Sequence, residues 1–293
     1  NTASGYANTY SASLEKVFDT RAGLFDMRLH YTYMDAKDVN PSQSSTVSSN
    51  YGRPATFDRN NRQLSTSDFE IEHRFNGSVS WSKALFGDNL TRISTFFEVR
   101  SGKRFSYTMR EQPFDEAVFG GHSAFARRDS QLLYVPLEND PNVIFSFTPE
   151  DTVNDAALEA NFNNFVNAAG LAGYRGQIVP RNHDTTDGRT KIDLRIQQEI
   201  GVGSLPGVGD LAIDLFLDFE NLGNMINNDW GRVEQVFFPH NFIAVGEVSL
   251  NANGQYVYGP FGSGGNFDGG IDPASFFELP SLWQAQMGIK IRF

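Results

Sequence analysis

The sequence predicts an all-β fold, the C-terminal portion of an antiparallel transmembrane β-barrel, and three observations favour this class. Apolar and polar residues alternate through most segments that resemble strands. These segments run for about ten residues or more, the length with which a tilted strand crosses a bilayer. The connections between them are alternately short and long, which is typical of periplasmic turns and extracellular loops.

Composition narrows the class of protein. The 293 residues carry a formal net charge of -11, so nucleic acid is not an expected partner. Cysteine is absent, which excludes disulfides, thiolate metal sites and cysteine nucleophiles. No apolar run approaches the roughly 18 residues of a transmembrane helix. The first residues lack the basic and apolar regions of a signal peptide.

The alternation is clearest in two segments. In 24–36, Phe25, Met27 and Leu29 alternate with charged residues, and in 283–293 every odd position is apolar or small. The same period of two recurs within 75–81, 92–99, 192–200 and 211–220. Such a period predicts strands with one apolar and one polar face.

Charges on the polar face favour a transmembrane barrel over a soluble sandwich, which also alternates. In a large barrel these side chains face a polar lumen, while the apolar face contacts lipid. They either line a substrate path or pair with one another or with a plug, and both roles are compatible. The predicted lumen charges are Arg92, Glu98, Arg100, Asp193, Arg195, Glu199, Asp214, Asp218 and Glu220.

Aromatic residues near strand ends are expected to form girdles at the two membrane interfaces. They are Phe18, Trp81, Phe105, Tyr107 and Trp283.

The segments predict about nine strands. They cover about 9–18, 24–36, 69–83, 90–109, 188–200, 210–222, 233–250, 255–260 and 276–293. The short turns are 19–23, 84–89, 201–210 and 251–254, and the long loops are near 37–68, 110–186, 224–232 and 261–280.

Strand parity places the chain within a larger barrel. If the short turns are periplasmic, the first and last strands both descend, and Phe293 ends in the periplasm. Single-chain bacterial barrels have even strand numbers and begin with an ascending strand, so we expect a C-terminal fragment. In a barrel of 22 strands, the size of plugged transporters, these would be strands 14 to 22.

One short helix is predicted in the longest loop. Apolar residues from Leu158 to Ala169 follow helical spacing. Thr148 is the expected N-cap, with Pro149 at the first helical position, and Gly170 is the expected end.

Several segments resemble, in order, the C-terminal barrel of Oar-like TonB-dependent outer-membrane receptors. They include "NYGRPATFD", "FEVRSGKRFSYT", "LLYVP", "YRGQIVPRN", "FLDFENLGNMINNDWG" and "SLWQAQMGIKIRF". The resemblance covers about residues 50 to 293, and the last two segments are the most distinctive.

The resemblance implies a 22-stranded barrel in a Gram-negative outer membrane, with extracellular loops, a periplasmic C-terminus, and contacts with lipid and lipopolysaccharide. It implies import of an extracellular ligand, driven by TonB through an N-terminal plug that these residues do not contain. It also implies that the barrel-assembly machinery reads the last strand as a signal. The matching positions are Trp283, Met287, Gly288, Ile289, Ile291 and Phe293.

Loop residues are the candidates for ligand contact, because binding residues concentrate on loops. They are Tyr51, Arg53, Phe57, Tyr134, Tyr174 and Arg175. An alternative function is a structural or surface-interaction barrel that imports nothing. An outer-membrane enzyme is a further alternative.

Neither catalysis nor a resident metal or cofactor is expected. His122 and Ser123 are adjacent, but neighbours in an extended segment point apart and no nucleophile elbow surrounds them. The five histidines lack metal-ligand spacing. The acidic loop segments 138–142, 149–155 and 266–273 offer oxygen ligands for calcium, but none has EF-hand spacing, so solvated loops are the expected state.

Overall fold

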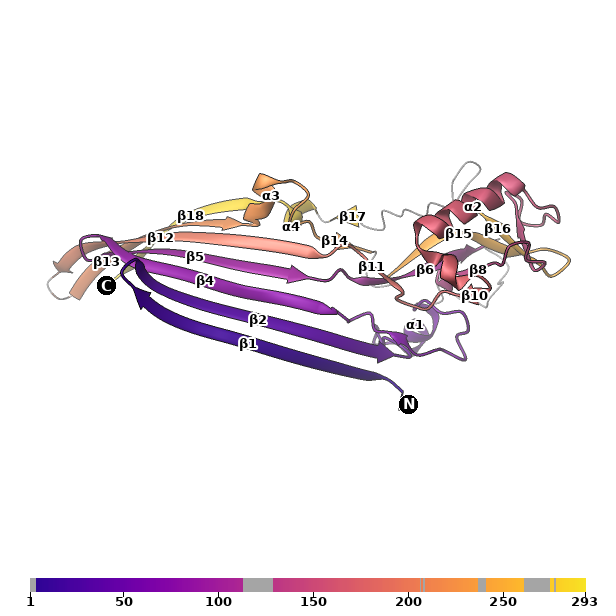
Figure 1. Cartoon of the computed structure of the whole chain (residues 1–293), viewed down its shortest axis with the longest axis horizontal. Coiled ribbons are helices and arrows are strands. Elements are labelled where there is room, and N and C mark those ends of the chain that lie inside the picture. The colour runs from indigo at the N-terminus through magenta and orange to yellow at the C-terminus, as the bar shows by residue number, and fades with distance from the viewer. Residues whose placement is uncertain are drawn as a thin grey trace.

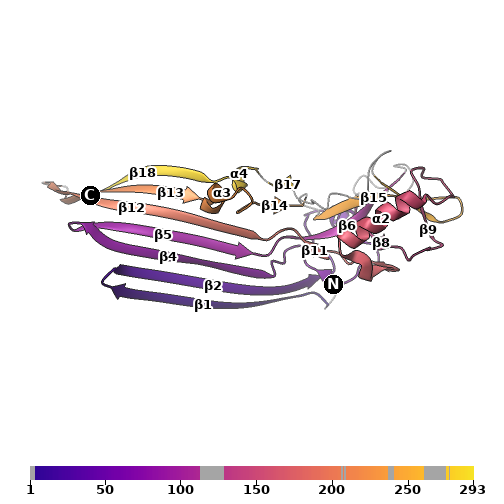
Figure 2. The same ribbon diagram turned by 45° about the horizontal axis from the view of Figure 1, so that its top comes forward.

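The chain forms a long antiparallel sheet with a separate lobe at one end of its strands (Figure 1). Figure 2 shows the same arrangement after rotation. This computed structural model describes residues 4–112, 129–205, 207, 209–236, 241–260, 275–276 and 278–293. No helix in these ranges is long and apolar enough to span a membrane.

Seven long strands make up the main sheet, and every neighbouring pair is antiparallel. In spatial order they are β1 (Tyr6–Thr20), β2 (Gly23–Asp38), β4 (His73–Phe86), β5 (Asn89–Arg100), β12 (Arg189–Leu205), β13 (Gly209–Glu220) and β18 (Gln284–Arg292). The short strand β3 (Ser65–Thr66) pairs with the end of β2.

Short and long connections lie at opposite ends of this sheet. Tight turns join β1 to β2, β4 to β5 and β12 to β13 at the end away from the lobe. The connections 39–72, 101–188 and 221–283 leave from the other end. Strands β1 and β18 run in the same direction, as expected from the sequence, and the C-terminus lies at the end with the short turns (Figure 1).

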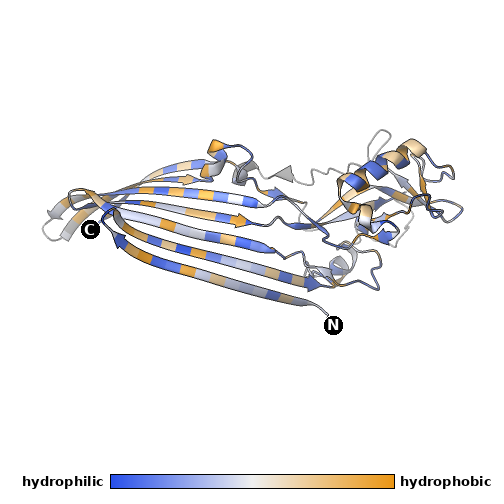
Figure 3. Ribbon diagram, viewed as in Figure 1, coloured by the Kyte–Doolittle hydropathy of each residue, from blue (hydrophilic) through white to orange (hydrophobic). Residues whose placement is uncertain are grey.

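The register places apolar side chains on one face of the sheet. One row of cross-strand partners is apolar in every strand, and it consists of Phe18, Phe25, Trp81, Ile93, Ile196, Leu217 and Met287. The adjacent row points to the other face and is polar in every strand after β1: Val17, Asp26, Ser80, Ser94, Arg195, Asp218 and Gln286. The alternating bands along the strands are visible in Figure 3.

The prediction of about nine sheet strands is wrong in two places. The predicted strand 90–109 is interrupted after Arg100, and β6 (Arg104–Glu111) enters the lobe. A Cβ at Gly102 would lie 1.7 Å from the carbonyl oxygen of Thr186, so this close backbone approach requires glycine.

Strands predicted at 233–250 and 255–260 belong to the lobe instead. There, β15 (Phe242–Leu250) pairs in parallel with β6 and antiparallel with β16 (Tyr256–Gly259). A register shift between Ala244 and Glu247 breaks the period of two, and Val245 and Val248 are both buried. Because these two strands leave the main sheet together, β13 pairs directly with β18 and the relative direction of the end strands is unchanged.

The predicted long loops near 37–68 and 110–186 build most of the lobe. Its central sheet has the order β11-β6-β15-β16-β9, and β7 also pairs with β6. Within the long loops, the short strands are β7 (Gln131–Leu132), β8 (Tyr134–Val135), β9 (Val143–Phe145), β10 (Gln177–Ile178) and β11 (Asp184–Thr185). The helical segments there are α1 (Val47–Gly52), α2 (Ala156–Ala168) and the 3-10 helix η1 (Leu171–Tyr174).

Helix α2 is the predicted helix, but it begins later than expected. Asp155 is the N-cap, and its carboxylate accepts hydrogen bonds from the backbone N–H groups of Ala157 at 2.9 Å and Leu158 at 3.1 Å. Thr148 therefore is not the cap. The expected C-terminal glycine is correct, because Gly170 follows the helix with a φ of 69°.

The described hydrophobic core lies in the lobe. Phe162, Phe165 and Val166 of α2 are buried against residues of its sheet, such as Tyr107 and Tyr258. Ala36 is the one buried apolar side chain that the described part of the seven long strands contains. The lobe therefore buries its apolar side chains, whereas the main sheet leaves most of its apolar side chains at the surface.

The distinctive segment after β13 forms an asparagine-centred connection. Asn221 adopts a left-handed conformation with a φ of 53° and precedes α3 (Leu222–Ile226). Its amide donates to the carbonyl oxygens of Gly231 at 3.2 Å and Ser281 at 2.7 Å. The connection also contains the paired strands β14 (Glu234–Gln235) and β17 (Ser275–Phe276), then α4 (Glu278–Ser281).

Of the five residues predicted to form aromatic girdles, three lie in or beside main-sheet strands and two do not. Phe18 stacks on Phe25 at 5.3 Å beside the β1–β2 turn, and Trp81 donates its indole N–H to the carbonyl oxygen of Ala22. Phe105 and Tyr107 are wrong as girdle residues, because both are buried in the lobe core. Trp283 is half-exposed just before β18.

The residues predicted as an assembly signal occupy both faces of β18 and its flanks. Met287, Ile289 and Ile291 lie on the apolar face beside Leu217, Leu215 and Ile213 of β13. Gly288 lies on the polar face opposite Phe216, and Trp283 and Phe293 flank the strand.

Candidate functional site

The polar face of the main sheet contains all nine charges that the sequence predicts for a lumen. The cross-strand register places Arg92, Glu98 and Arg100 of β5 on the same face as Asp193, Arg195 and Glu199 of β12. The same register adds Asp214, Asp218 and Glu220 of β13 to that face. Alternation alone was enough to predict this grouping.

Six of the nine charges form ion pairs with side chains on the same face, mostly across strands. Glu98 binds Arg74 at 2.7 Å, and Arg195 binds Asp218 through two hydrogen bonds of 2.6 Å. In addition, Arg292 contacts Glu199 at 2.7 Å and Asp214 at 2.9 Å, and Lys191 contacts Asp193 at 2.9 Å. Ion pairs therefore compensate six of the nine predicted lumen charges, whereas a substrate path and a plug contact stay predictions.

Arg92, like Arg100 on the same strand, is an arginine of this face without a described ion pair. The described residues provide it with no ion pair, and it lies between two open hollows of about 480 and 220 Å³. Asp26 and Arg195 line the first hollow, and Asp214 and Arg292 line the second. Its guanidinium, near the β4–β5 turn, is available to an anionic partner.

The predicted ligand-contact residues do not form one site. Tyr51 donates to Asn60 at 2.9 Å near α1, and Arg53 follows that helix. Tyr174 contacts His183, and Arg175 donates to Asn163 at 2.6 Å and to the carbonyl oxygen of Pro136 at 3.1 Å. These four residues have local structural contacts.

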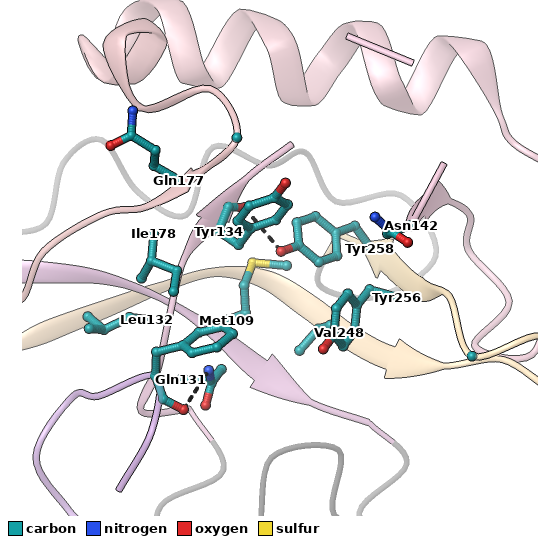
Figure 4. Close-up of a pocket in the computed structure, with 13 residues that line it drawn as sticks. Met109, Gln131, Leu132, Tyr134, Asn142, Gln177, Ile178, Val248, Tyr256 and Tyr258 are labelled. Atoms are coloured by element: carbon teal, nitrogen blue, oxygen red, sulfur yellow. Dashed lines mark hydrogen bonds between the residues drawn. The ribbon is translucent and has the colours of Figure 1, made fainter. Parts of the chain in front are cut away.

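Phe57 and Tyr134 are the two predicted residues that the structure brings together. They line a cavity of about 430 Å³ in the lobe, which we name the lobe cavity (Figure 4). Strands β6, β7, β8, β10, β15 and β16 contribute to its wall. Its other lining residues are Met109, Gln131, Leu132, Asn142, Gly176, Gln177, Ile178, Val248, Gly254, Tyr256 and Tyr258.

Hydrogen bonds fix the tyrosines of the lobe cavity. The Tyr134 hydroxyl donates to the Asp140 carboxylate at 2.7 Å, and the Tyr258 hydroxyl donates to the Tyr134 carbonyl oxygen at 3.1 Å. Burial and the hydrogen bond to Asp140 raise the pKa of Tyr134 to about 12. Both phenols therefore stay protonated at neutral pH and offer oxygen lone pairs to the cavity, since burial also raises the pKa of Tyr258.

Sequence reasoning missed most of the cavity because its residues come from distant segments. Tyr256 and Tyr258 lie in a segment predicted to cross the membrane, and Met109 lies in another. Gln131 carried no motif. The register shift between Ala244 and Glu247, which separates β15 from the regular strands, is seen only in the structure.

A second cavity shares a wall with the first. It has a volume of about 420 Å³, and Phe57, Leu132 and Ile178 line both cavities. Arg62 and Arg181 also line it. Burial, with the nearby Arg181 and Arg59, lowers the pKa of Arg62.

Buried and partly exposed ion pairs attach the lobe to the end of β2 and to the segment before β4. Arg181 contacts Asp38 at the end of β2 and Asp68 at 3.3 Å, and Asn182 donates to the carbonyl oxygen of Thr66 at 2.7 Å. Arg104 of β6 binds Glu70 and Glu72, each at 2.7 Å. Burial raises the pKa of Asp68, although Arg181 and Asn182 oppose the shift.

The acidic segments considered for calcium organise turns. Asp140 accepts from the Tyr134 hydroxyl and from the backbone N–H groups of Leu137 and Asn142. Asp151 accepts from the backbone N–H of Val153, the Ser146 hydroxyl and the backbone N–H of Thr152, and these hydrogen bonds lower its pKa. Across the ranges given above, no group of three or more acidic, histidine or cysteine side chains is arranged to hold a metal ion. His122 and Ser123, and all of 266–273, lie outside those ranges.

Comparisons of the chain with protein-family models, curated proteins and solved structures found no significant match.

Proposed function

We propose that the chain forms part of the wall of an outer-membrane β-barrel that binds and imports an extracellular ligand, as a TonB-dependent receptor does. The main sheet would cross the membrane and the lobe would lie outside the cell. One observation carries this proposal: the sheet exposes its apolar side chains, whereas the lobe buries its own.

The exposed apolar face is too continuous for contact with water. Leu14 of β1 is 55% exposed and Met287 of β18 is 82% exposed, and apolar partners connect these edges across the sheet. Soluble monomers rarely expose contiguous apolar patches above a few hundred Å². Strands of 9 to 17 residues are also long enough to cross a bilayer when tilted.

The opposite face suits a polar lumen. Its ion pairs connect β4 to β5, β12 to β13, and β18 to both β12 and β13. Paired charges are acceptable beside water but costly in lipid. Arg92 is the side chain that we assign to contact with a plug or with a passing anionic group.

Further strands would complete the barrel. Strands β1 and β18 each have one long partner, so both edges of the described sheet are open. An exposed edge strand invites aggregation, whereas closure removes the edge. In this proposal a longer protein supplies the other strands, the plug and the TonB contact, and the barrel-assembly machinery recognises β18.

Surface accessibility tests the proposed orientation. A peptide epitope is inserted at Gly254, in a lobe turn, and a matched one at Gly87, in the β4–β5 turn; a Cβ at either glycine would meet open space. Antibody should label intact cells through the Gly254 insertion and label the Gly87 insertion only after the outer membrane is permeabilised. Equal labelling of both sites on intact cells, or of neither, would contradict the orientation.

The import part of the proposal is tested separately by the native protein. Its mass in isolated membranes should exceed 32.7 kDa substantially, and its upstream residues should include a plug with a TonB-binding segment. A membrane protein without a plug would instead support a surface-interaction barrel.

A further inference from the structure

We propose that the lobe cavity binds a neutral saccharide. The inference extends the proposed function, because it names the class of ligand that an extracellular lobe would capture. It rests on the chemistry of the cavity wall: apolar rings, free hydrogen-bond acceptors and no charged side chain among the described lining residues.

The cavity wall offers hydrogen-bond acceptors, because the hydroxyl protons of its Tyr134 and Tyr258 are already donated to other protein groups. Tyr134 donates to Asp140 and Tyr258 donates to the carbonyl oxygen of Tyr134, so each hydroxyl oxygen can only accept from a ligand. Figure 4 shows the second of these contacts, from the Tyr258 hydroxyl to the Tyr134 carbonyl oxygen. A ligand for this cavity must therefore supply hydrogen-bond donors.

Gln131 adds a buried acceptor that lacks a partner. The residue is 2% exposed, and its Nε2 donates to the carbonyl oxygen of Phe57 at 3.3 Å. Its Oε1 has no hydrogen-bond partner among the described residues. An unsatisfied buried acceptor costs about 1–3 kcal/mol, and a ligand hydroxyl would remove this cost.

The absence of a counter-charge favours a neutral ligand over a cation. The Asp140 carboxylate contacts the wall, and the Tyr134 hydroxyl and two backbone N–H groups already occupy it. A buried ammonium group without a paired carboxylate would be costly. Neutral sugars supply hydroxyl donors without this cost.

The rings provide the apolar part of the site. Phe57, Tyr134, Tyr256 and Tyr258 line the cavity from three separate segments of the chain. Aromatic rings can pack against the C–H face of a sugar while its hydroxyls reach the acceptors. The volume of about 430 Å³ lies in the usual range of small-molecule sites, roughly 300–1,000 Å³.

The test uses the intact protein in detergent and four neutral disaccharides: maltose, cellobiose, lactose and diacetylchitobiose. Calorimetry and saturation-transfer NMR should detect binding of at least one of them. Gln131→Met, which keeps the volume but removes the acceptor, should weaken that binding about 5- to 100-fold. Phe57→Leu, which removes a ring, should also weaken it.

Gln112→Leu is the matched control, because this glutamine is in the lobe, bonds to Glu247 and does not line the lobe cavity. The Gln112→Leu variant should bind the disaccharide with the same affinity as the unmodified protein. The proposal is overturned if no neutral disaccharide binds, if neither cavity variant weakens binding, or if choline or glucosamine binds in preference. The measurement needs neither membrane orientation nor import, so its failure is distinct from failure of the proposed function.

Discussion

The ring of Phe216 on β13 occupies the space that any side chain at Gly288 on β18 would need. A Cβ at Gly288 would lie 2.2 Å from Cζ of Phe216, its direct cross-strand partner. On β12, the guanidinium carbon of Arg195 lies 5.0 Å from the centre of the same ring. Three strands thus meet at one aromatic side chain on the polar face.

Replacing Gly288 should destabilise the last strand. Gly288→Ala forces the Phe216 ring to move, and overpacking of this kind costs about 1–3 kcal/mol. Chemical unfolding in lipid or detergent measures the loss. Adding Phe216→Ala should recover part of the loss caused by Gly288→Ala, because the ring is then absent.

Gly173→Ala serves as the control for that experiment, since a Cβ there would contact nothing within 4 Å. It should leave the free energy of unfolding nearly unchanged. If Gly288→Ala lowers the free energy of unfolding no more than this control does, the close contact between Gly288 and Phe216 is refuted.

The cap of α2 separates the observed helix start from the predicted one. Asp155→Ala removes the acceptor for two backbone N–H groups and should cost about 0.5–2 kcal/mol of lobe stability. Thr148→Ala changes an exposed residue outside the helix and should cost less than about 0.5 kcal/mol. Thermal unfolding of both variants measures which residue caps the helix. A larger loss of stability for Thr148→Ala than for Asp155→Ala would contradict Asp155 as the N-cap and favour the predicted start.

Asn221 combines an unusual backbone conformation with two side-chain hydrogen bonds. Asn221→Gly keeps the left-handed conformation but loses the bonds to Gly231 and Ser281, whereas Asn221→Ala loses both features. We expect both variants to increase proteolysis of the 222–236 connection. Asn221→Ala should lower its local stability by about 1 kcal/mol more than Asn221→Gly, because alanine disfavours the left-handed conformation. Equal protection of the unmodified protein and both variants would show that this asparagine does not anchor the connection.

Asp68 should make the attachment of the lobe sensitive to pH. Burial raises its pKa in the folded protein above the ordinary value of 3.8. The folded state therefore binds this proton more tightly than the unfolded state does. The resulting stability is fully present below about pH 4 and is lost as pH rises through the raised pKa.

Comparison with Asp68→Asn isolates this effect from other carboxylates. The free energy of unfolding of the unmodified protein, relative to that of Asp68→Asn, should fall as pH increases from about 4. Hydrogen exchange of the amides at 182–186 reports local opening beside Asp68. A relative stability that rises with pH would contradict the assignment.

The strands of the main sheet could be predicted from the sequence, because a period of two shows which face of a strand each side chain occupies. Residues 24–36 and 283–293 therefore led to β2 and β18, and the predicted lumen charges share one face. The same rule failed at β15, where a register shift and burial on both faces gave an apolar segment of strand length that belongs to the lobe instead of the main sheet. Local periodicity cannot distinguish apolar residues that contact lipid from those that contact a lobe core.

The lobe cavity was beyond prediction for a different reason. Phe57, Gln131 and Tyr258 are more than 70 residues apart in sequence, and their proximity depends on parallel pairing of β6 with β15 and of β16 with β9. Such long-range pairing leaves no spacing motif. Phe57 and Tyr134 were predicted as loop residues, but nothing in their segments indicated a shared site.

The most direct test of the account compares the two faces of one strand. The chain has no cysteine, so Ile93→Cys on the apolar face and Ser94→Cys on the polar face of β5 each introduce a single labelling site. A fluorophore at position 93 should be quenched by brominated lipid, and one at position 94 by aqueous iodide. Equal quenching of both positions by iodide would show that both faces contact water, and would contradict a sheet that spans the membrane.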